Sequence, residues 1–376
     1  MTTPLNEKLQ TVKWGNYKLG DIFDILSYKK RFDANKVTIY ETGQYPYIVR
    51  MGTNNGQRGF INEDIKFLND GNTISFGQDT ATVFYQEKPY FTGDKIKILK
   101  PKFDEFGKKN ALFFVAAMNL SFKSFSWGSS SFNIKIIKNV ELTLPSTPDG
   151  QINFAFMESF IAELEAERIA ELSAYLKVSG LDDYHLSQDE ENALQAFQQN
   201  LYSFGEFRID MIFNQIKQGR RLKKEDQIPG KIPFVMSGVT NTGVIGYVSN
   251  PVASFPANSI TVDIFGNTFY RNYYFGAGDD TGVYWNDTVS YNSKIMLFFA
   301  AAIEKALQGK FSYGKKLRSS QSNGFKMLLP IKSGKPDYQT MELLISAIQK
   351  LVIKDVVQYA NIKIDKTKQI IAEIKN

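Results

Sequence analysis

The sequence predicts an α+β fold in which one strand-rich module occurs twice and each copy is followed by a long helix. Two observations carry this prediction: an internal repeat at a nearly constant offset, and apolar stripes at helical spacing after each copy. The 376 residues also exceed the roughly 100–200 residues of a typical domain, so two domains are the default. With 43% hydrophobic residues, the chain has enough apolar area for packed cores.

The two copies open with the same strand pattern. Residues 14–25 (WGNYKLGDIFDI) match residues 204–216 (FGEFRIDMIFNQI), each an aromatic-Gly pair followed by alternating aromatic and aliphatic positions. Such alternation predicts a strand with one buried face. A basic cluster follows in both copies: Lys29, Lys30 and Arg31 in the first, and Arg220, Arg221, Lys223 and Lys224 in the second.

A hairpin is predicted next in each copy. Residues 45–61 (YPYIVRMGTNNGQRGFI) match residues 232–248 (IPFVMSGVTNTGVIGYV), with Pro46 and Pro233 and two glycine pairs in register and a third pair, Gly52 and Gly238, one position apart. The Asn-rich tip predicts a tight turn, because Asn and Gly tolerate the positive φ that such turns require. The strands keep their pattern while the tips differ, TNNGQRG against TNTGVIG, as they would if one scaffold read two different targets.

The end of each copy also corresponds. An apolar helical segment at 112–118 (LFFVAAM) matches 297–303 (LFFAAAI), residues 125–128 (FSWG) match 311–314 (FSYG), and Leu144-Pro145 matches Leu329-Pro330. The offset stays close to 185–190 residues throughout, so few insertions separate the copies.

A long helix is expected after each Leu-Pro, at residues 153–178 and 337–375. The first carries an apolar stripe of Met157, Phe160, Ile161, Leu164, Ile169, Leu172 and Leu176, and the second one of Met341, Ile345, Ile348, Val352, Tyr359 and Ile362. At 1.5 Å per residue the second helix could reach roughly 55–60 Å, which suits a spacer. Residues 181–200 are taken as the connector, an acidic solvated stretch continuing into a short helix.

The composition excludes most catalytic chemistry. No cysteine is present, which rules out disulfides, Cys-ligated zinc, iron–sulfur clusters and thiol nucleophiles. The one histidine, His185, lies in the connector, and residues 276–282 (GAGDDTG) have the wrong spacing for a phosphate loop and are interpreted as a turn. The sequence therefore predicts no catalytic residue, no metal site and no cofactor. Residues 1–13 lack a signal-peptide core and no stretch approaches ~20 apolar residues, so a cytoplasmic protein is expected.

The remaining polar positions suit a polyanion. The net charge is +6, phosphate contacts need Lys and Arg, and base edges need side chains such as Arg for guanine and Asn or Gln for adenine. The candidate contact residues are Lys29, Lys30, Arg31, Arg50, Asn54, Asn55, Gln57 and Arg58 in the first copy, and Arg220, Arg221, Lys223, Asn241, Thr242, Lys315, Lys316, Arg318, Ser319 and Gln321 in the second. Each could instead be an ordinary solvated turn residue. A tandem β-rich module for carbohydrate or protein, and a nuclease using carboxylates alone, are the alternatives.

With its doubled openings, its doubled hairpins and a Leu-Pro before each long helix, the chain resembles the specificity (S) subunit of type I restriction–modification enzymes. The similar recognition subunit of type IIB systems fits equally well. The resemblance implies two target recognition domains, at 1–150 and 201–335, with spacer helices at 151–200 and 336–376 packed as a pseudo-twofold antiparallel coiled coil. It further implies that each domain reads one half of a bipartite site in double-stranded DNA. The implied partners are N6-adenine methyltransferase subunits and a cleavage subunit.

Overall fold

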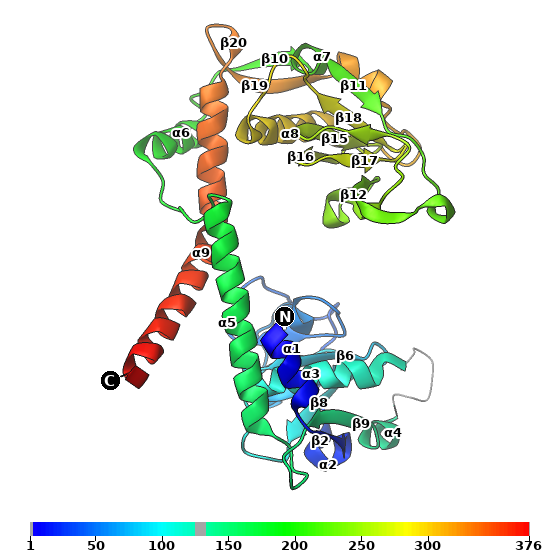
Figure 1. Ribbon diagram of the computed structural model, residues 1–376, viewed down its shortest axis with the longest axis vertical. Helices are drawn as coiled ribbons and strands as arrows, with labels where there is room; N and C mark the ends of the chain where they lie inside the picture. The colour runs from blue at the N-terminus through cyan, green and yellow to red at the C-terminus, as the bar shows by residue number, and fades with distance from the viewer. Residues whose placement is uncertain (1–2, 125–132, 376) are drawn as a thin grey trace. The chain divides into compact units, whose positions relative to one another are not determined.

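The computed structural model describes residues 3–124 and 133–375 and divides into two compact units, Met1–Leu172 and Ser173–Asn376 (Figure 1). Residues 125–128, matched above with 311–314, lie outside the described residues. The described part of the chain contains no helix with both the length and the apolar character that crossing a bilayer requires.

Unit 1 is built from short strands, and helix α3 packs against β6 and β9. A four-stranded antiparallel sheet has the order β2-β8-β5-β6, a three-stranded sheet has the order β4-β3-β7, and β1 pairs with β9. The elements are α1 (Thr3–Thr11), β1 (Trp14–Lys18), α2 (Leu19–Ile22), β2 (Phe23–Ser27), β3 (Pro46–Ile48), β4 (Gln57–Phe60), β5 (Thr73–Gly77), β6 (Thr82–Gln86), β7 (Phe91–Thr92), β8 (Ile96–Pro101), α3 (Lys108–Ser121), α4 (Ile134–Lys138), β9 (Glu141–Pro145) and α5 (Phe154–Val178). Helix α5 crosses the division between the units.

Unit 2 repeats this plan and adds two short strands, β14 and β20, that have no counterpart among the strands described in unit 1. Its sheets have the orders β11-β18-β15-β16 and β13-β12-β17-β14, and β10 pairs with β19 as β1 pairs with β9. The elements are α6 (Gln188–Gln198), β10 (Phe204–Arg208), α7 (Ile209–Ile212), β11 (Gln215–Gln218), β12 (Pro229–Val235), β13 (Val244–Val248), β14 (Ser254–Phe255), β15 (Ser259–Asp263), β16 (Thr268–Arg271), β17 (Phe275–Ala277), β18 (Thr281–Trp285), α8 (Ser293–Leu307), β19 (Lys326–Lys332), β20 (Lys335–Pro336) and α9 (Tyr338–Lys375). The predicted α+β class and the predicted repeat are confirmed.

The cores of the two units occupy equivalent positions. Strands β5 and β15 lie inside their sheets and are buried at every position, although their sequences, TISFG and SITVD, alternate between polar and apolar residues. Phe114 of α3 packs edge-on against Phe23, and Phe299 of α8 packs edge-on against Phe213. Glycine-rich residues 276–282 form the end of β17, a turn and the start of β18, as expected.

Each long helix is anchored to its own unit at its first turn. The backbone N–H groups of Asn153 and Asp337 donate to the carbonyls of Pro145 and Pro330, and their side chains accept from Phe156 and Thr340. Met157 and Met341 then enter the two main cores with no exposed surface. The Leu-Pro pairs therefore fix where α5 and α9 leave their domains.

The predicted stripe on α9 is only partly buried. Met341 lies in the core, whereas Ile348, Val352, Tyr359 and Ile362 are exposed. The helix packs on α8 and α6, and its buried residues include Leu344 and Ala347, which the predicted stripe did not contain.

The connector is more ordered than the solvated linker expected from its acidic sequence. Helix α6 begins with a capping box between Ser187 and Glu190, and Glu190 is 5% exposed. The Nζ atom of Lys350 on α9 lies 3.0 Å from Glu190 Oε2 and 2.9 Å from Asp183 Oδ2. Burial raises the pKa of Glu190, but hydrogen bonds from Ser187, Ser346 and Lys350 outweigh it and lower the pKa to about 2. His185 is exposed, as predicted.

The methionine anchor gives a stability prediction. Met341→Ala removes a fully buried side chain and should destabilise unit 2 by about 2–5 kcal/mol. With Trp14 and Trp127 replaced by Phe, the fluorescence of Trp285 reports the unfolding of this unit in urea. Val352→Ala is the matched control, because Val352 is 74% exposed and its loss should cost less than about 0.5 kcal/mol. Equal losses of unfolding free energy in the two variants would contradict the anchoring role of Met341.

Candidate DNA interface

Each unit has a hollow at the same place in its fold. Both hollows lie between the basic segment after the first sheet strand, the central hairpin, and the Gly-Asp pair that follows the parallel strand. The first has a volume of about 590 Å³ and is lined by Arg31, Phe32, Asp33, Ala34, Tyr47, Val49, Arg50, Arg58, Thr80, Gly93 and Asp94. The second, of about 450 Å³, is lined by Arg221, Leu222, Lys223, Lys224, Gln227, Met236, Ile245, Gly278 and Asp279.

Glycine permits the close packing behind each hollow. The Gly93 N–H donates to the Ile48 carbonyl at 2.8 Å, and the Gly278 N–H donates to the Val235 carbonyl at 2.9 Å. A Cβ atom on Gly93 would lie 3.0 Å from Val49 Cγ1, and one on Gly278 would lie 3.1 Å from Met236 Cγ. These bonds continue the parallel pairing of β3 with β7 and of β12 with β17, which the sequence did not reveal.

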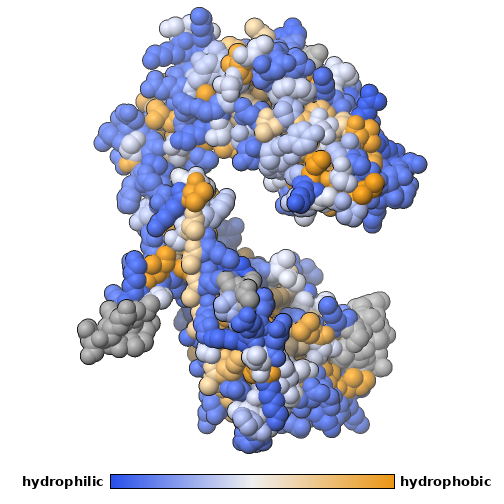
Figure 2. Space-filling model, in the orientation of Figure 1, coloured by the Kyte–Doolittle hydropathy of each residue, from blue (hydrophilic) through white to orange (hydrophobic). Residues whose placement is uncertain are grey.

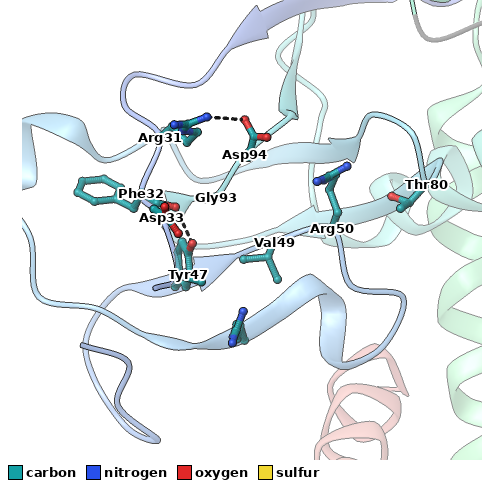
Figure 3. A pocket seen from close by; sticks show the side chains of 11 residues that line it. Arg31, Phe32, Asp33, Tyr47, Val49, Arg50, Thr80, Gly93 and Asp94 are labelled. Atoms are coloured by element: carbon teal, nitrogen blue, oxygen red, sulfur yellow. Dashed lines mark hydrogen bonds and ion pairs between the residues drawn. The ribbon is translucent and has the colours of Figure 1, made fainter. Parts of the chain in front are cut away.

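The first hollow brings three arginines together, and two of them are neutralised. Arg31 Nη1 lies 3.4 Å from Asp94 Oδ1, on one side of the hollow in Figure 3, and Arg50 lies on the other side near Thr80. Arg50 Nη1 is 3.0 Å from Asp79 Oδ2. Arg58 has no ion pair with any residue that the structure describes. Burial raises the pKa of the Tyr47 hydroxyl, which donates to the Phe32 carbonyl at 2.7 Å and supports the wall.

The second hollow has a more uniformly cationic rim. Arg221, Lys223 and Lys224 line it, and Arg318 Nη1 donates to the Asp279 carbonyl at 2.8 Å from a neighbouring loop. At the position of Arg58 stands Ile245, which is 54% exposed. The frame is thus the same in both units while the charge and polarity of the lining differ.

A buried polar side chain braces each hairpin tip. Gln86, the last residue of β6, donates to the Asn55 carbonyl at 3.2 Å and to Ser75 Oγ at 3.0 Å. Arg271, the last residue of β16, is 1% exposed; it donates to the carbonyl and hydroxyl of Thr242 and to Thr261 Oγ1. Burial lowers the pKa of Arg271, which has no ion pair within the described ranges, although an arginine stays charged.

Gln86 and Arg271 hold hairpin tips whose backbone is strained. Asn54, Asn55, Asn241 and Thr242 have φ values of 49°, 54°, 47° and 52°. Left-handed conformations cost non-glycine residues about 1–3 kcal/mol each and persist where the surroundings enforce them, often at functional sites. The amides of Asn54 and Asn241 donate to Gln57 and Val244, and that of Asn55 donates to Tyr85, so these candidate contact residues also shape the turn.

Other predicted contact residues lie outside the two linings. Lys29 Nζ is 3.8 Å from Asp70, Lys30 Nζ stands 4.5 Å from the centroid of the Phe67 ring, and Arg220 lines an adjoining hollow with Lys217. Ser319 is buried, and the side-chain carbonyl of Gln321 accepts the Arg318 backbone N–H. Lys316 stands 4.6 Å from the centroid of the exposed ring of Tyr313, one residue after Lys315.

Sequence reasoning missed Asp79, Asp94, Asp279, Gln86 and Arg271. The sequence repeat matches Phe84-Tyr85 with Phe269-Tyr270 and so places Gln86 opposite Arg271, but it gives neither side chain a role. Tyr85 and Tyr270 donate equivalent hydrogen bonds to Asn72 and Asn258, which agrees with this match. The described residues hold no cluster of three or more His, Asp or Glu side chains suited to a metal ion. On the face shown in Figure 2, hydrophilic residues predominate in both units and hydrophobic ones are scattered.

Comparison with known proteins agrees with this duplicated arrangement. Residues 11–174 and 203–376 each match the family model described as the type I restriction modification DNA specificity domain. The two matched ranges begin shortly before β1 and β10 and include most of α5 and all of α9.

Individual relatives match over most of their length. The specificity subunit S.BcgI of a type II restriction enzyme from Heyndrickxia coagulans is 28% identical over 348 residues, covering 91% of this chain and 96% of that one. A putative type I specificity subunit from Mycoplasma pneumoniae is 25% identical over 266 residues, covering 68% and 69%. The crystal structure of a type I restriction–modification S subunit from M. genitalium shares the fold, with a TM-score of 0.56 at 17% identity over 96% and 94% of the chains. The chain belongs to the type I restriction–modification DNA specificity family, as a non-catalytic DNA-recognition subunit of a restriction–modification system.

Proposed function

We propose that this subunit reads a bipartite site in double-stranded DNA, with one half read by each domain. The target recognition domains are residues 1–150 and 201–335, and residues 151–200 and 336–376 supply the spacer. The supporting observation is the pair of equivalent hollows, which share one backbone frame but differ in the side chains that they present. A carbohydrate- or protein-binding module is not favoured, because the family is one of DNA specificity.

The contact surface proposed here consists of the two hollows and the loops beside them. Cations with no ion pair to any described residue, such as Arg58 and Arg221, would neutralise phosphates or donate to base edges, and polar side chains at the tips would complete the contacts. The proposed residues are Lys29, Lys30, Arg31, Arg50, Asn54, Asn55, Gln57 and Arg58, with Arg220, Arg221, Lys223, Asn241, Thr242, Lys315, Lys316, Arg318, Ser319 and Gln321.

The chemistry of modification is assigned to partners. We propose that the subunit docks N6-adenine methyltransferase subunits, and an endonuclease subunit as well, and that it acts in the cytoplasm. Methyl transfer to adenine requires the base to be flipped into a pocket of the enzyme that modifies it. This chain has to hold that enzyme over the correct adenine by gripping the flanking sequence.

Charge reversal tests the contact surface. Arg58→Glu and Arg221→Glu should each weaken DNA binding by the full chain and lower the slope of log K against log salt by about 0.9 for each phosphate that is no longer neutralised. Lys109→Glu is the control, because it makes the same charge change at an exposed position of α3 outside the hollow. Fluorescence anisotropy at several salt concentrations measures both quantities. If the hollow variants bind as the control does, these two arginines do not contact the DNA.

Domain exchange tests the modular assignment. Replacing residues 1–145 by the matching part of a relative should change one half of the methylated motif and leave the other half unaltered. The cut falls at Pro145, after β9 closes the domain against β1, so the core of unit 2 keeps all of its residues. Mapping N6-methyladenine across the genome of the expressing cells gives the motif. A change in both halves would refute the modular reading of the site.

A further inference from the structure

We propose that residue 58 in the first domain and residue 245 in the second are equivalent base-selecting positions, at which Arg58 takes guanine and Ile245 takes thymine. This inference rests on the proposed bipartite recognition and adds the chemistry of one base pair in each half-site. It is argued from strand register, hollow lining, exposure and the identity of the two side chains.

Both residues are the extra residue of a β-bulge at the same point of the central hairpin. In unit 1, Tyr47 pairs with Gly59 and Ile48 pairs with Gln57, so Arg58 has no partner of its own. In unit 2, Phe234 pairs with Gly246 and Val235 pairs with Val244, which leaves Ile245 unpaired. A bulge re-aims the side chain of the extra residue and is frequent beside functional sites. The bulge occurs at the same point in both copies, although their sequences differ there. We infer that the two bulged positions have the same function.

The bulged side chains line the two equivalent hollows. Arg58 faces the first with Gly93 and Asp94, and Ile245 faces the second with Gly278 and Asp279. Behind each bulge the tip is fixed by Gln86 or Arg271 and by its left-handed residues. The backbone that carries the bulged side chain is therefore set before any ligand arrives, which lowers the cost of ordering this part of the chain on binding.

Arg58 is equipped to read guanine. Its neighbours Arg31 and Arg50 are paired with Asp94 and Asp79, whereas Arg58 has no carboxylate partner among the residues described. An unpaired guanidinium keeps its planar fork of N–H donors free. Two of those donors match O6 and N7 on the major-groove edge of guanine, which is the most frequent specific arginine–base contact.

Ile245 is equipped to contact thymine. More than half of its surface is exposed, inside a rim made cationic by Arg221, Lys223 and Lys224. A branched apolar side chain forms no hydrogen bond with water and no ion pair with phosphate, so it needs an apolar partner. The C5-methyl group of thymine is the apolar group on the major-groove edge of DNA, so it is the base feature that this side chain can recognise.

Reciprocal substitution on a randomised target tests the assignment. The full chain is purified with the subunits that bind it in its own cells, and the complex selects duplexes from a random library. Arg58→Ile should lower the preference for guanine at one position of one half-site by roughly ten- to a hundred-fold, the range for one bidentate pair. Ile245→Arg should create a guanine preference in the other half-site, at a position where the parent complex selects thymine.

Matched variants separate selection from charge and from folding. Arg58→Lys keeps the positive charge but loses the fork, so it should retain affinity better than Arg58→Ile while losing the preference for guanine. Lys109→Ile removes the same charge outside the hollow and should leave the selected motif unchanged. Thermal unfolding of each variant identifies any loss that comes from misfolding, and Arg58→Gln then replaces Arg58→Ile.

The outcomes distinguish this inference from the function on which it rests. If the parent complex selects no bipartite motif, the proposed function fails. If the parent selects one and Arg58→Ile leaves its guanine preference intact, or if the two substitutions alter the same half-site, the base assignment is overturned. If Ile245→Arg changes affinity without changing the motif, the assignment fails at position 245, which then contacts the backbone or a protein subunit instead.

Discussion

The structure depends on one constraint in each domain: a strained hairpin tip must be held rigidly against the central sheet. Four non-glycine tip residues adopt left-handed backbone conformations, and a β-branched residue such as Thr242 rarely does so. Buried hydrogen bonds to the tip offset the conformational cost of this left-handed backbone. Gln86 makes them in one unit and Arg271 in the other. An arginine buried without a carboxylate is costly, and it is tolerated because the tip supplies a carbonyl and a hydroxyl.

The two domains share the backbone frame that this constraint imposes, and they differ in the side chains that the frame presents. Strand order, the Gly-Asp pair beside the hairpin, the bulge and the methionine anchor recur in both units. The side chains that face outward from this frame differ, with arginine and paired carboxylates in one hollow and isoleucine with a cationic rim in the other. A rigid frame with interchangeable side chains lets one fold recognise two different sequences, as a DNA specificity subunit requires.

The sequence predicted the fold wherever the signal was local or repeated. The duplicated openings, the hairpins and the starts of α5 and α9 at a Leu-Pro could all be located, because the repeat shows each pattern twice. The parallel pairing of β7 and β17 could not, since strands of two or three residues carry no periodicity. Contact between α6 and α9 was missed because Glu190 and Lys350 are 160 residues apart in the chain.

The site could be predicted only in part. Arg31, Arg50, Arg58 and Arg221 were selected for their charge, and the structure gathers them at the hollows. Gln86 and Arg271 were missed, because a polar residue at a strand end suggests a solvated position. Ile245 was passed over because it is apolar, although the aligned tips place it opposite Arg58; the strand register adds that both residues are the extra residue of a bulge.

The central claim, that two equivalent hairpin edges face separate parts of one duplex, is tested most directly by crosslinking. A photoreactive amino acid is placed at position 58 or 245 of the full chain in complex with its target DNA, and the linked nucleotides are sequenced. Crosslinks from the two positions should fall at bases in opposite halves of the recognised site. Crosslinks to the same half, or none from either position while DNA stays bound, would contradict the account.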